Sequence, residues 1–309
     1  MKLKMRKYQD ETDYWRIRQF LRSTYPLNKH RTLNWHVAQL DYWRWHILLN
    51  CREITALDDL IYIWETDRQE IAAVLNLEKP NQAFLQIHPA HKSFQLEDEM
   101  IMQAEEILRG SDHQSDPVME MWSNVDDTVR NDLLTKHGFT PGKWVESQWW
   151  RDLTAPISPV KLPDGYQIRS LGDNHEIPAR SWASWRGFHP ESPDEDYEGW
   201  EWYRNIQRCP LYRRDLDLVA EAPTGEIASF CTIWFDDVTR SAYIEPVATV
   251  PEHLRKGLAR ATITAGLNRV QKMGCTRAFV SGFEAGPNAL YSATLSPQHD
   301  TFQHWIKKL

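Results

Sequence analysis

The sequence predicts a mixed α/β fold built from two tandem copies of one unit. The length of 309 residues favours two domains, at roughly 100–200 residues each. Residues 153–163 hold three prolines in eleven residues and show no amphipathic period, which is typical of an extended connection between folded units. The same order of expected strands and helices also occurs twice, at a spacing of about 160 residues. We therefore expect one domain over residues 1–155 and another over residues 156–309.

The composition is that of an ordinary globular protein and excludes several classes. Hydrophobic residues make up 41% of the chain and charged residues 26%, so neither a disordered polymer nor a membrane-embedded protein is indicated. The net charge of −7 gives no global attraction to nucleic acid or to anionic lipid. No run of about 18 apolar residues occurs, and the amino terminus lacks the apolar core of a signal peptide. We expect neither a nucleic-acid nor a membrane partner, and a monomer or a homodimer.

The cysteines favour a reducing compartment, and we expect the cytoplasm. They lie far apart and form no CxxC pair, at positions Cys51, Cys209, Cys231 and Cys275. No histidine partner can be assigned to any of them from the sequence, so an acyl-enzyme nucleophile is not expected. His88 and His91 have the spacing of a metal pair, but a proline lies between them and no further ligand is evident, so we expect no metal.

In the first half, apolar periodicity predicts each element in turn. Tyr14, Ile17 and Leu21 follow helical spacing, whereas the next apolar runs are short and separated by charged turns, as in strands. The expected elements are a strand at 3–6, helices at 10–24 and 33–49, strands at 60–64, 71–77 and 83–87, a helix at 95–108, a strand at 118–121, a helix at 126–137 followed by Gly138, and a strand at 144–150.

The second half repeats this order. Ala259, Ile263 and Leu267 keep a period of 3.6 residues, which predicts a helix that ends at Gly274. The expected elements are a strand at 166–171, a helical aromatic region at 176–206, strands at 216–221, 227–235 and 242–250, a helix at 257–273, a strand at 278–281, a short helix at 288–293 and a strand at 302–306.

Residues 245–260 are the most informative stretch, because a strand leads there through a basic, glycine-containing turn into a helix. The amino end of a helix presents unpaired amides and the positive end of the helix dipole. Arg255, Lys256 and Arg260 add full charges. This chemistry favours a pyrophosphate site, and the alternative is a charged turn in which Gly257 caps the helix. No glycine precedes Gly110, so such a loop is not expected in the first hundred residues.

This stretch resembles the pyrophosphate loop of the GNAT superfamily of acetyl-CoA-dependent N-acetyltransferases. The family loop reads Gln/Arg-x-x-Gly-x-Gly/Ala, and residues 254–259 read Leu-Arg-Lys-Gly-Leu-Ala, which departs at Leu254. Residues 274–281 resemble the fifth strand of the family, and residues 288–291 resemble its Asn-x-x-Ala-x-x-Leu-Tyr region without the Gly-Phe that usually follows. Residues 87–94 lack the glycine of the loop, so the first half looks like a degenerate copy. The resemblance implies two tandem GNAT-type units over nearly the whole chain.

The resemblance also implies where acetyl-CoA would bind as co-substrate. Pantetheine is an extended amide chain that can pair with a strand, and one amide of Val247 or Ala248 would polarise the thioester carbonyl and hold the oxyanion. Pro246 has no amide donor, which predicts an irregular point on this strand. The residues implied in binding are Val247, Ala248, Thr249, Leu254, Arg255, Lys256, Gly257, Leu258, Ala259, Arg260 and Asn288.

Acetyl transfer to an amine needs a base for the amine and an acid for the departing thiolate. Glu245 is the candidate base, because it lies two residues before Val247 on the same strand face, and a partly desolvated carboxylate has a raised pKa. Tyr291 is the candidate acid, with Asn288 one turn earlier on the same helix face. The alternatives are an exposed strand glutamate and a buried core tyrosine.

Residues 181–203 concentrate rings and carboxylates in the region that covers the acceptor cleft in GNAT folds. Such a mixture suits a cationic amine, and the alternative is a packed helix with a solvated acidic face. We expect an N-acetyltransferase that acts on a primary amine of a small molecule by direct transfer in a ternary complex. The alternative, prompted by Leu254 and the missing Gly-Phe, is a catalytically impaired acyl-CoA-binding or regulatory protein, and a different acyl group also remains open.

Overall fold

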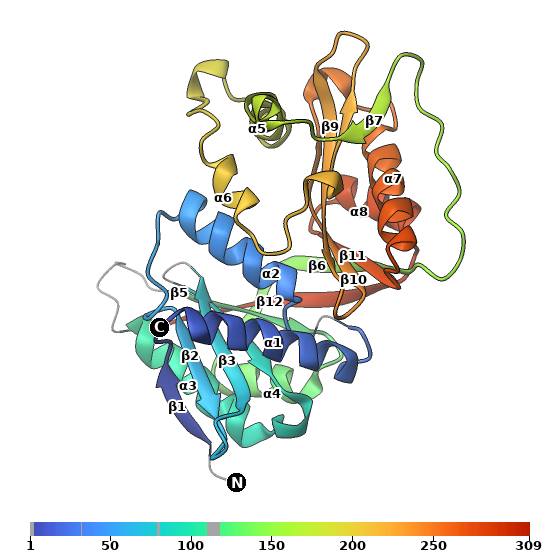
Figure 1. Cartoon of the computed structure of the whole chain (residues 1–309). Helices are drawn as coiled ribbons and strands as arrows, with labels where there is room; N and C mark the ends of the chain where they lie inside the picture. Colours follow the sequence, from blue (N-terminus) through green and yellow to red (C-terminus); the bar gives the residue numbers. More distant parts are fainter. Residues whose placement is uncertain (1–2, 32, 79–80, 110–117) are drawn as a thin grey trace. The chain divides into compact units, whose positions relative to one another are not determined.

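The computed structural model describes residues 3–31, 33–78, 81–109 and 118–309, and the chain divides into two compact units (Figure 1). Unit 1 comprises Met1–Leu40, Cys51–Gln148 and Asp300–Leu309, and unit 2 comprises Asp41–Asn50 and Trp149–His299. Each unit thus takes segments from both halves of the chain, whereas the sequence predicts one boundary near Ala155. Pairing between distant strands decides such an exchange, and it leaves no local signal in the sequence.

Unit 1 contains strands in the order β1-β2-β3-β4-β5-β12-β6. The last strand of the chain runs antiparallel to β5, with Phe302 opposite Asn124. The elements are β1 (Lys4–Lys7), α1 (Glu11–Leu27), α2 (Val37–Tyr42), β2 (Ile61–Glu65), β3 (Ile71–Glu78), β4 (Gln82–Ile87), η2 (Pro89–His91), α3 (Phe94–Arg109), β5 (Val118–Asn124), α4 (Thr128–Lys136), β6 (Thr140–Asp152) and β12 (His299–Lys308).

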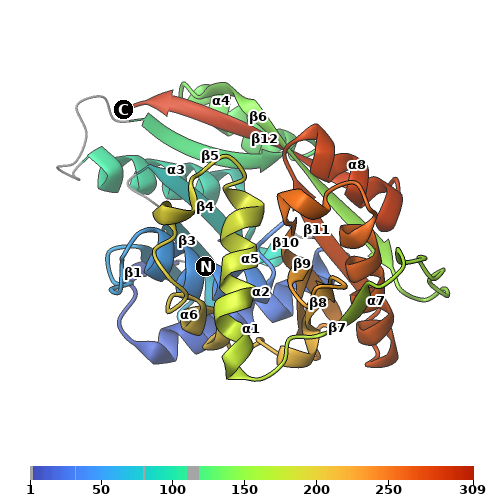
Figure 2. The same cartoon turned by 90° about the horizontal axis from the view of Figure 1, so that it is seen from above.

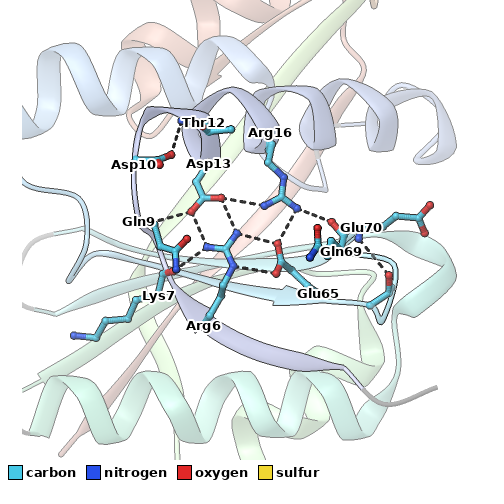
Figure 3. Close-up of polar contacts among 11 residues, drawn as sticks. Arg6, Lys7, Gln9, Asp10, Thr12, Asp13, Arg16, Glu65, Gln69 and Glu70 are labelled. Carbon is cyan, nitrogen blue, oxygen red and sulfur yellow. Dashed lines mark hydrogen bonds and ion pairs between the residues drawn. The ribbon is translucent and has the colours of Figure 1, made fainter.

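An ion network joins β1, α1 and β2 of unit 1 (Figure 3). Arg6 donates to both carboxylate oxygens of Asp13 at 2.6 Å and to Glu65 at 2.9 Å. Arg16 pairs with Asp13 at 3.0 Å and with Glu65 at 2.7 Å. Burial opposes ionisation of Asp13, but the hydrogen bonds from Arg6, from the Gln9 amide and from Arg16, with the charge of Arg6, together outweigh it and lower the pKa of that carboxyl. Every charge of this partly buried cluster is therefore paired, and its role is structural.

Unit 2 contains strands in the order β11-β10-β9-β8-β7, with the last residues of β6 next to β11. The π-helix η1 (Trp43–Cys51) contributes to it, although it comes from the first half of the chain. The other elements are β7 (Gln167–Ser170), η3 (Asn174–Glu176), α5 (Ile177–Phe188), η4 (Asp194–Asp196), α6 (Tyr203–Gln207), η5 (Arg214–Leu216), β8 (Asp217–Glu221), β9 (Ile227–Asp236), β10 (Ser241–Thr249), η6 (Pro251–His253), α7 (Leu258–Lys272), β11 (Arg277–Gly282) and α8 (Ala285–Thr294).

The central strand of unit 2 is β9, which is buried along its whole length because helices cover both of its faces. Ile233 belongs to a core cluster with Leu267 of α7. Phe230 faces the other way and lies under the guanidinium of Arg180 from α5, 3.7 Å from its carbon to the ring centroid. Figure 2 shows α5 and α7 on opposite sides of β9. Because side chains alternate along β9, one face of the strand packs against α7 and the other against α5.

The structure corrects two of the expected helices. The helix expected at 33–49 is the short α-helix α2 followed by the π-helix η1, because apolar periodicity does not distinguish bonds to the fourth residue from bonds to the fifth. The region expected to be helical at 176–206 contains α5 and α6, with an irregular stretch between them. Pro190, Pro193 and Gly199, which has a φ of 104°, interrupt the helix there. The glycine ends of α4 and α7 are confirmed, with φ values of 82° at Gly138 and 91° at Gly274.

We predict that Gly266→Ala destabilises unit 2. A Cβ at this position of α7 would lie 2.3 Å from Cδ1 of Ile233 and 2.6 Å from Cδ1 of Leu218. Overpacking of this kind costs about 1–3 kcal/mol, which exceeds the roughly 1 kcal/mol that alanine gains over glycine in a helix. Gly286→Ala in α8 is the matched control, because nothing lies within 4 Å of its Cβ position. The midpoints of urea unfolding should fall for Gly266→Ala and stay level or rise for Gly286→Ala. Equal midpoints for wild type and Gly266→Ala would show that α7 can move away from β9 at little cost.

Candidate functional site

The turn between β10 and α7 has the backbone geometry of an anion site. Arg255 and Gly257 both have left-handed backbone conformations, with φ values of 60° and 77°. Gly257 is the N-cap of α7 and offers no side chain that could bond to the amides of the first turn. Leu258, the first helical residue, is 1% exposed and anchors the helix in the core. The amino end of α7 therefore presents amides and its dipole at the surface.

The charged residues of this turn are not equivalent. Within the part of the chain that the structure describes, Arg255 and Arg260 are exposed and have no hydrogen-bond or ion-pair partner. Lys256 instead places its Nζ 3.1 Å from Oη of Tyr166 and 3.2 Å from the carbonyl of Glu252. Leu254, the position that departs from the family motif, is 53% exposed. Two uncommitted guanidinium groups thus flank the helix end.

The strand that leads into the turn has one open edge. Pairing of β10 with β11 covers the three residues from Ser241 to Tyr243, within the described residues. Val247, Ala248 and Thr249 pair with β9 on one side, and no strand pairs with their other edge among the described residues. An extended amide chain can add to such an edge by backbone hydrogen bonds.

The pairing of β10 with β9 shifts register between Ile244 and Val247. This confirms the irregular point expected at Pro246, which lies inside the shift. The carbonyl of Glu245 accepts a hydrogen bond from Nε1 of Trp234 at 2.5 Å. Trp234 is fully buried and lies on the facing strand, so it satisfies a carbonyl that the shifted ladder leaves out.

The structure brings the candidate base and the candidate acid into one electrostatic neighbourhood. Tyr291 lies in α8 and is 6% exposed. Burial raises the pKa of the Tyr291 phenol well above its usual range, and the charges of Glu245 and Cys231 raise it further. Tyr291 therefore keeps its proton at ordinary pH, and the charge of Glu245 favours this protonated form.

Asn288 lies one turn before Tyr291 on α8, as the spacing predicts. Its Oδ1 accepts a hydrogen bond from Nε1 of Trp149 at 2.8 Å. A Cβ on Gly282 would lie 2.4 Å from that same oxygen, so the amide is packed closely against the end of β11. Sequence reasoning missed Trp149 because it lies among tryptophans that are typical of a core. The structure places it beside the candidate pantetheine residue.

The aromatic and acidic residues of the 181–203 region separate in the structure. The rings pack against one another, with centroids 5.3 Å apart for Trp182 and Trp185 and 5.1 Å apart for Trp182 and Tyr197. The three carboxylates of η4, Asp194–Asp196, are exposed. The region is therefore a ring cluster with an acidic rim facing solvent.

A second aromatic group reaches this site from η1, and sequence reasoning missed it. The ring of His46 lies 4.8 Å from that of Tyr42 and 5.5 Å from that of Trp202, measured between centroids. Burial lowers the pKa of His46 to about 4, so its imidazole is neutral. Tyr42 also contacts Trp234, which bonds to Glu245. No local sequence pattern indicates this contact, because η1 ends at Cys51 and the main segment of unit 2 begins only at Trp149.

The equivalent turn of unit 1 lacks these features. Ser93 caps α3 with its own hydroxyl, which accepts a hydrogen bond from the amide of Leu96 at 3.2 Å. Glu97 of the first turn is fully buried and pairs with Arg130 at 2.7 Å. Lys92 has a φ of −61°, in the extended region. The chain itself thus supplies the cap and the negative charge at this helix end.

The rings of His88 and His91 lie 5.5 Å apart. Among the residues that the structure describes, no group of three histidine, cysteine or acidic side chains could hold a metal. No helix in the described ranges has both the length and the apolar composition that crossing a bilayer requires.

Comparison with known proteins agrees with this geometry. Residues 175–291 match the Acetyltransferase (GNAT) family. The fold is similar to that of a GCN5-related N-acetyltransferase from Sphaerobacter thermophilus, with a TM-score of 0.69 and 15% identity, covering 99% of this chain and 95% of that chain. It is also similar to a tandem GNAT protein from the clavulanic acid biosynthesis pathway, with a TM-score of 0.69 and 12% identity over 99% and 98% of the two chains.

An acetyltransferase of the GNAT family from Colwellia psychrerythraea has a TM-score of 0.61 at 10% identity, with 98% of this chain and 100% of that chain covered. Among curated protein sequences the chain has no match. The family match covers the turn, the open strand edge and α8 as far as Tyr291, and the structural matches extend over both units. Residues 175–291 therefore match the GNAT acetyltransferase family, and the chain as a whole has the fold of a tandem GNAT protein.

Proposed function

We propose that the protein is an N-acetyltransferase that moves an acetyl group from acetyl-CoA to a primary amine of a small molecule by direct attack in a ternary complex. One observation carries this proposal. The left-handed turn at Arg255 and Gly257 opens α7 beside a strand whose edge is unpaired beyond Tyr243, within the described residues. An anion site next to an open strand edge suits a pyrophosphate joined to an extended amide chain.

The proposed binding residues divide between strand and turn. Pantetheine would pair along the open edge of β10, and an amide of Val247 or Ala248 would polarise the thioester carbonyl. Asn288 would contact pantetheine from α8. The residues that we assign to the acetyl-CoA site, either by contact or by holding the turn in shape, are Val247, Ala248, Thr249, Leu254, Arg255, Lys256, Gly257, Leu258, Ala259, Arg260 and Asn288.

Two residues would move protons. Glu245 would accept a proton from the acceptor amine, directly or through water, and Tyr291 would donate one to the sulfur of the departing thiolate. The raised pKa of Tyr291 supports the second role, because an acid must carry its proton at the working pH. The negative charge of Glu245 contributes to that raised pKa, so the two residues are electrostatically coupled.

We propose that unit 1 is a degenerate copy without acetyl-CoA. The Ser93 cap and the buried Glu97 support this, since both occupy positions that a pyrophosphate would need at the start of α3. We also propose that the protein acts in the cytoplasm, where the free thiols of Cys51, Cys209, Cys231 and Cys275 would stay reduced.

We predict that the protein binds one acetyl-CoA per chain. Titration calorimetry should give a stoichiometry of one, and Arg255→Glu should weaken binding by about 1–3 kcal/mol, or roughly 5- to 150-fold, through loss of a charge-assisted contact. Arg68→Glu in the β2–β3 turn of unit 1 carries the same charge change and should bind as the wild type does. Two molecules per chain would contradict the degenerate unit 1.

We predict that Tyr291→Phe and Glu245→Gln lower turnover while acetyl-CoA affinity hardly changes. Each removes one proton-transfer group and keeps the shape, and a positioned acid or base is worth about 10²–10⁴-fold in rate. Loss in Glu245→Gln should be greatest at low pH, where fewer amines are already neutral, and higher pH should partly rescue it. Initial rates from pH 6 to pH 9 would measure this.

Two outcomes would change this assignment. Unchanged turnover in Tyr291→Phe would remove Tyr291 from the mechanism and leave water as the proton donor. A wild-type protein that binds acetyl-CoA tightly and acetylates no amine in a broad panel would instead favour the acyl-CoA-binding or regulatory alternative.

We propose that the acceptor is cationic, because the acidic rim of η4 faces solvent beside the ring cluster. Replacing Asp194, Glu195 and Asp196 with the corresponding amides should raise the KM for a polyamine more than the KM for an arylalkylamine, with little effect on kcat. Added salt should reproduce the effect in the wild type by screening the rim. Equal, salt-insensitive changes for both amines would leave this rim as an ordinary solvated surface.

A further inference from the structure

We propose that Lys256 is a positioning residue, which holds the phosphate-binding turn in shape through Tyr166 and His253, while Arg255 and Arg260 supply the charge that meets the phosphates. The inference rests on acetyl-CoA binding at this turn, as proposed above. It gives Lys256 a role that its place in the loop motif does not predict.

The side chain of Lys256 points into a polar cluster that we call the brace, formed by Lys256, Tyr166, His253 and Glu226. Nζ of Lys256 lies 3.1 Å from Oη of Tyr166 and 3.4 Å from Nδ1 of His253. Oη of Tyr166 lies 2.8 Å from that same Nδ1, and Nε2 of His253 lies 2.8 Å from Oε1 of Glu226. The ammonium also lies over the ring of Tyr166, 5.6 Å from its centroid.

One assignment of protons satisfies each short contact of the brace. Lys256 donates to the oxygen of Tyr166, and the hydroxyl of Tyr166 donates to Nδ1 of His253. Nε2–H of His253 then donates to Glu226. The chain of donors then runs in one direction from the ammonium to the carboxylate.

The brace ties three separate segments of unit 2 together. Tyr166 precedes β7, Glu226 lies in the turn between β8 and β9, and His253 belongs to η6 directly before the phosphate-binding turn. The first two segments also pack closely, because a Cβ on Gly165 would lie 2.7 Å from Cγ of the Pro223 ring. Tyr166 further packs on the small core cluster that contains Leu258. Through His253 before the turn and Lys256 within it, the brace holds the turn against the segments that contain Tyr166 and Glu226.

The turn needs such a restraint because Arg255 has a φ of 60°, a conformation that a residue with a Cβ adopts reluctantly. Neighbouring structure must hold it there. His253 is buried and lies two residues before Arg255, and Lys256 is the residue directly after Arg255. The two cations of this turn and helix start that have no partner among the described residues, Arg255 and Arg260, are then presented to the ligand in a fixed position.

A double-mutant cycle with acetyl-CoA binding as its readout tests this role. Tyr166→Phe removes the hydroxyl and keeps the ring, and Lys256→Met removes the ammonium and keeps the stem. Each should weaken acetyl-CoA binding about 3- to 10-fold, the effect of one hydrogen bond, and the double variant should be no weaker than the worse single variant. Arg255→Met combined with Tyr166→Phe should weaken binding by less than the product of the two single effects, because the brace acts through Arg255 as well as through Arg260.

The readout must also separate positioning from a general loss of structure. Acetyl-pantetheine lacks the pyrophosphate, so Tyr166→Phe should bind it as the wild type does, and kcat of Tyr166→Phe at saturating acetyl-CoA should stay unchanged. Glu226→Gln keeps an acceptor for His253 and should bind acetyl-CoA normally, whereas Glu226→Ala should weaken binding. Tyr62→Phe and Lys7→Met are matched controls, because this lysine lies 5.9 Å from the Tyr62 ring centroid in unit 1.

Each alternative result has a distinct meaning. If Lys256 leaves the brace and binds phosphate directly, Tyr166→Phe would bind acetyl-CoA as well as or better than the wild type, and the two substitutions would multiply. Equal weakening toward acetyl-pantetheine would assign Tyr166 a merely structural role. A wild-type protein that binds no acetyl-CoA would overturn the proposed function itself, before the brace is tested.

Discussion

The register shift of β10 against β9 is the constraint on which the site depends. Between Ile244 and Val247 the ladder skips two residues, and the buried indole of Trp234 takes up the carbonyl of Glu245 that the ladder leaves out. An unpaired carbonyl at this depth would cost about 1–3 kcal/mol, so the indole stabilises the shift. The shift places Glu245 close to Tyr291, and beyond it β10 has an open edge that leads into the turn before α7.

The layer of α5 depends on a second buried interaction. Nε of Arg180 donates to Asp217 at 3.1 Å, and the hydroxyls of Tyr203 and Tyr212 donate to the same carboxylate at 2.5 and 3.0 Å. A buried ion pair is tolerated when its polar atoms find such partners. It holds α5 on β9, and the far end of α5 then packs so closely on β10 that a Cβ at Gly187 would lie 2.7 Å from that of Ala248. The buried pair of Arg180 and Asp217 thus helps to set the distance between α5 and β10, the strand along which pantetheine is proposed to bind.

The two units differ in a few local features at the corresponding strand and helix. In unit 1, β4 pairs with β3 without a shift from Ala73 to Glu78, so no residue is displaced as Glu245 is. Its helix α3 begins with a serine cap, whereas α7 begins with a glycine that has no side chain to offer its amides. Both units keep the strand order and the helix that follows. A register shift and a helix cap therefore distinguish the two units at this position.

The sequence by itself determined the features that arise from local interactions: the repeated order of elements, the glycine ends of α4 and α7, the irregular point at Pro246, and the turn at 254–259 with its family resemblance. These follow from periodicity, backbone conformation and missing donors, which each short segment carries within itself. Tertiary structure alone decided that η1 belongs to unit 2 and β12 to unit 1, that Trp149 bonds to Asn288, and that Lys256 faces Tyr166. Those contacts join segments far apart in the chain, where the energy of pairing depends on partners that no local pattern specifies.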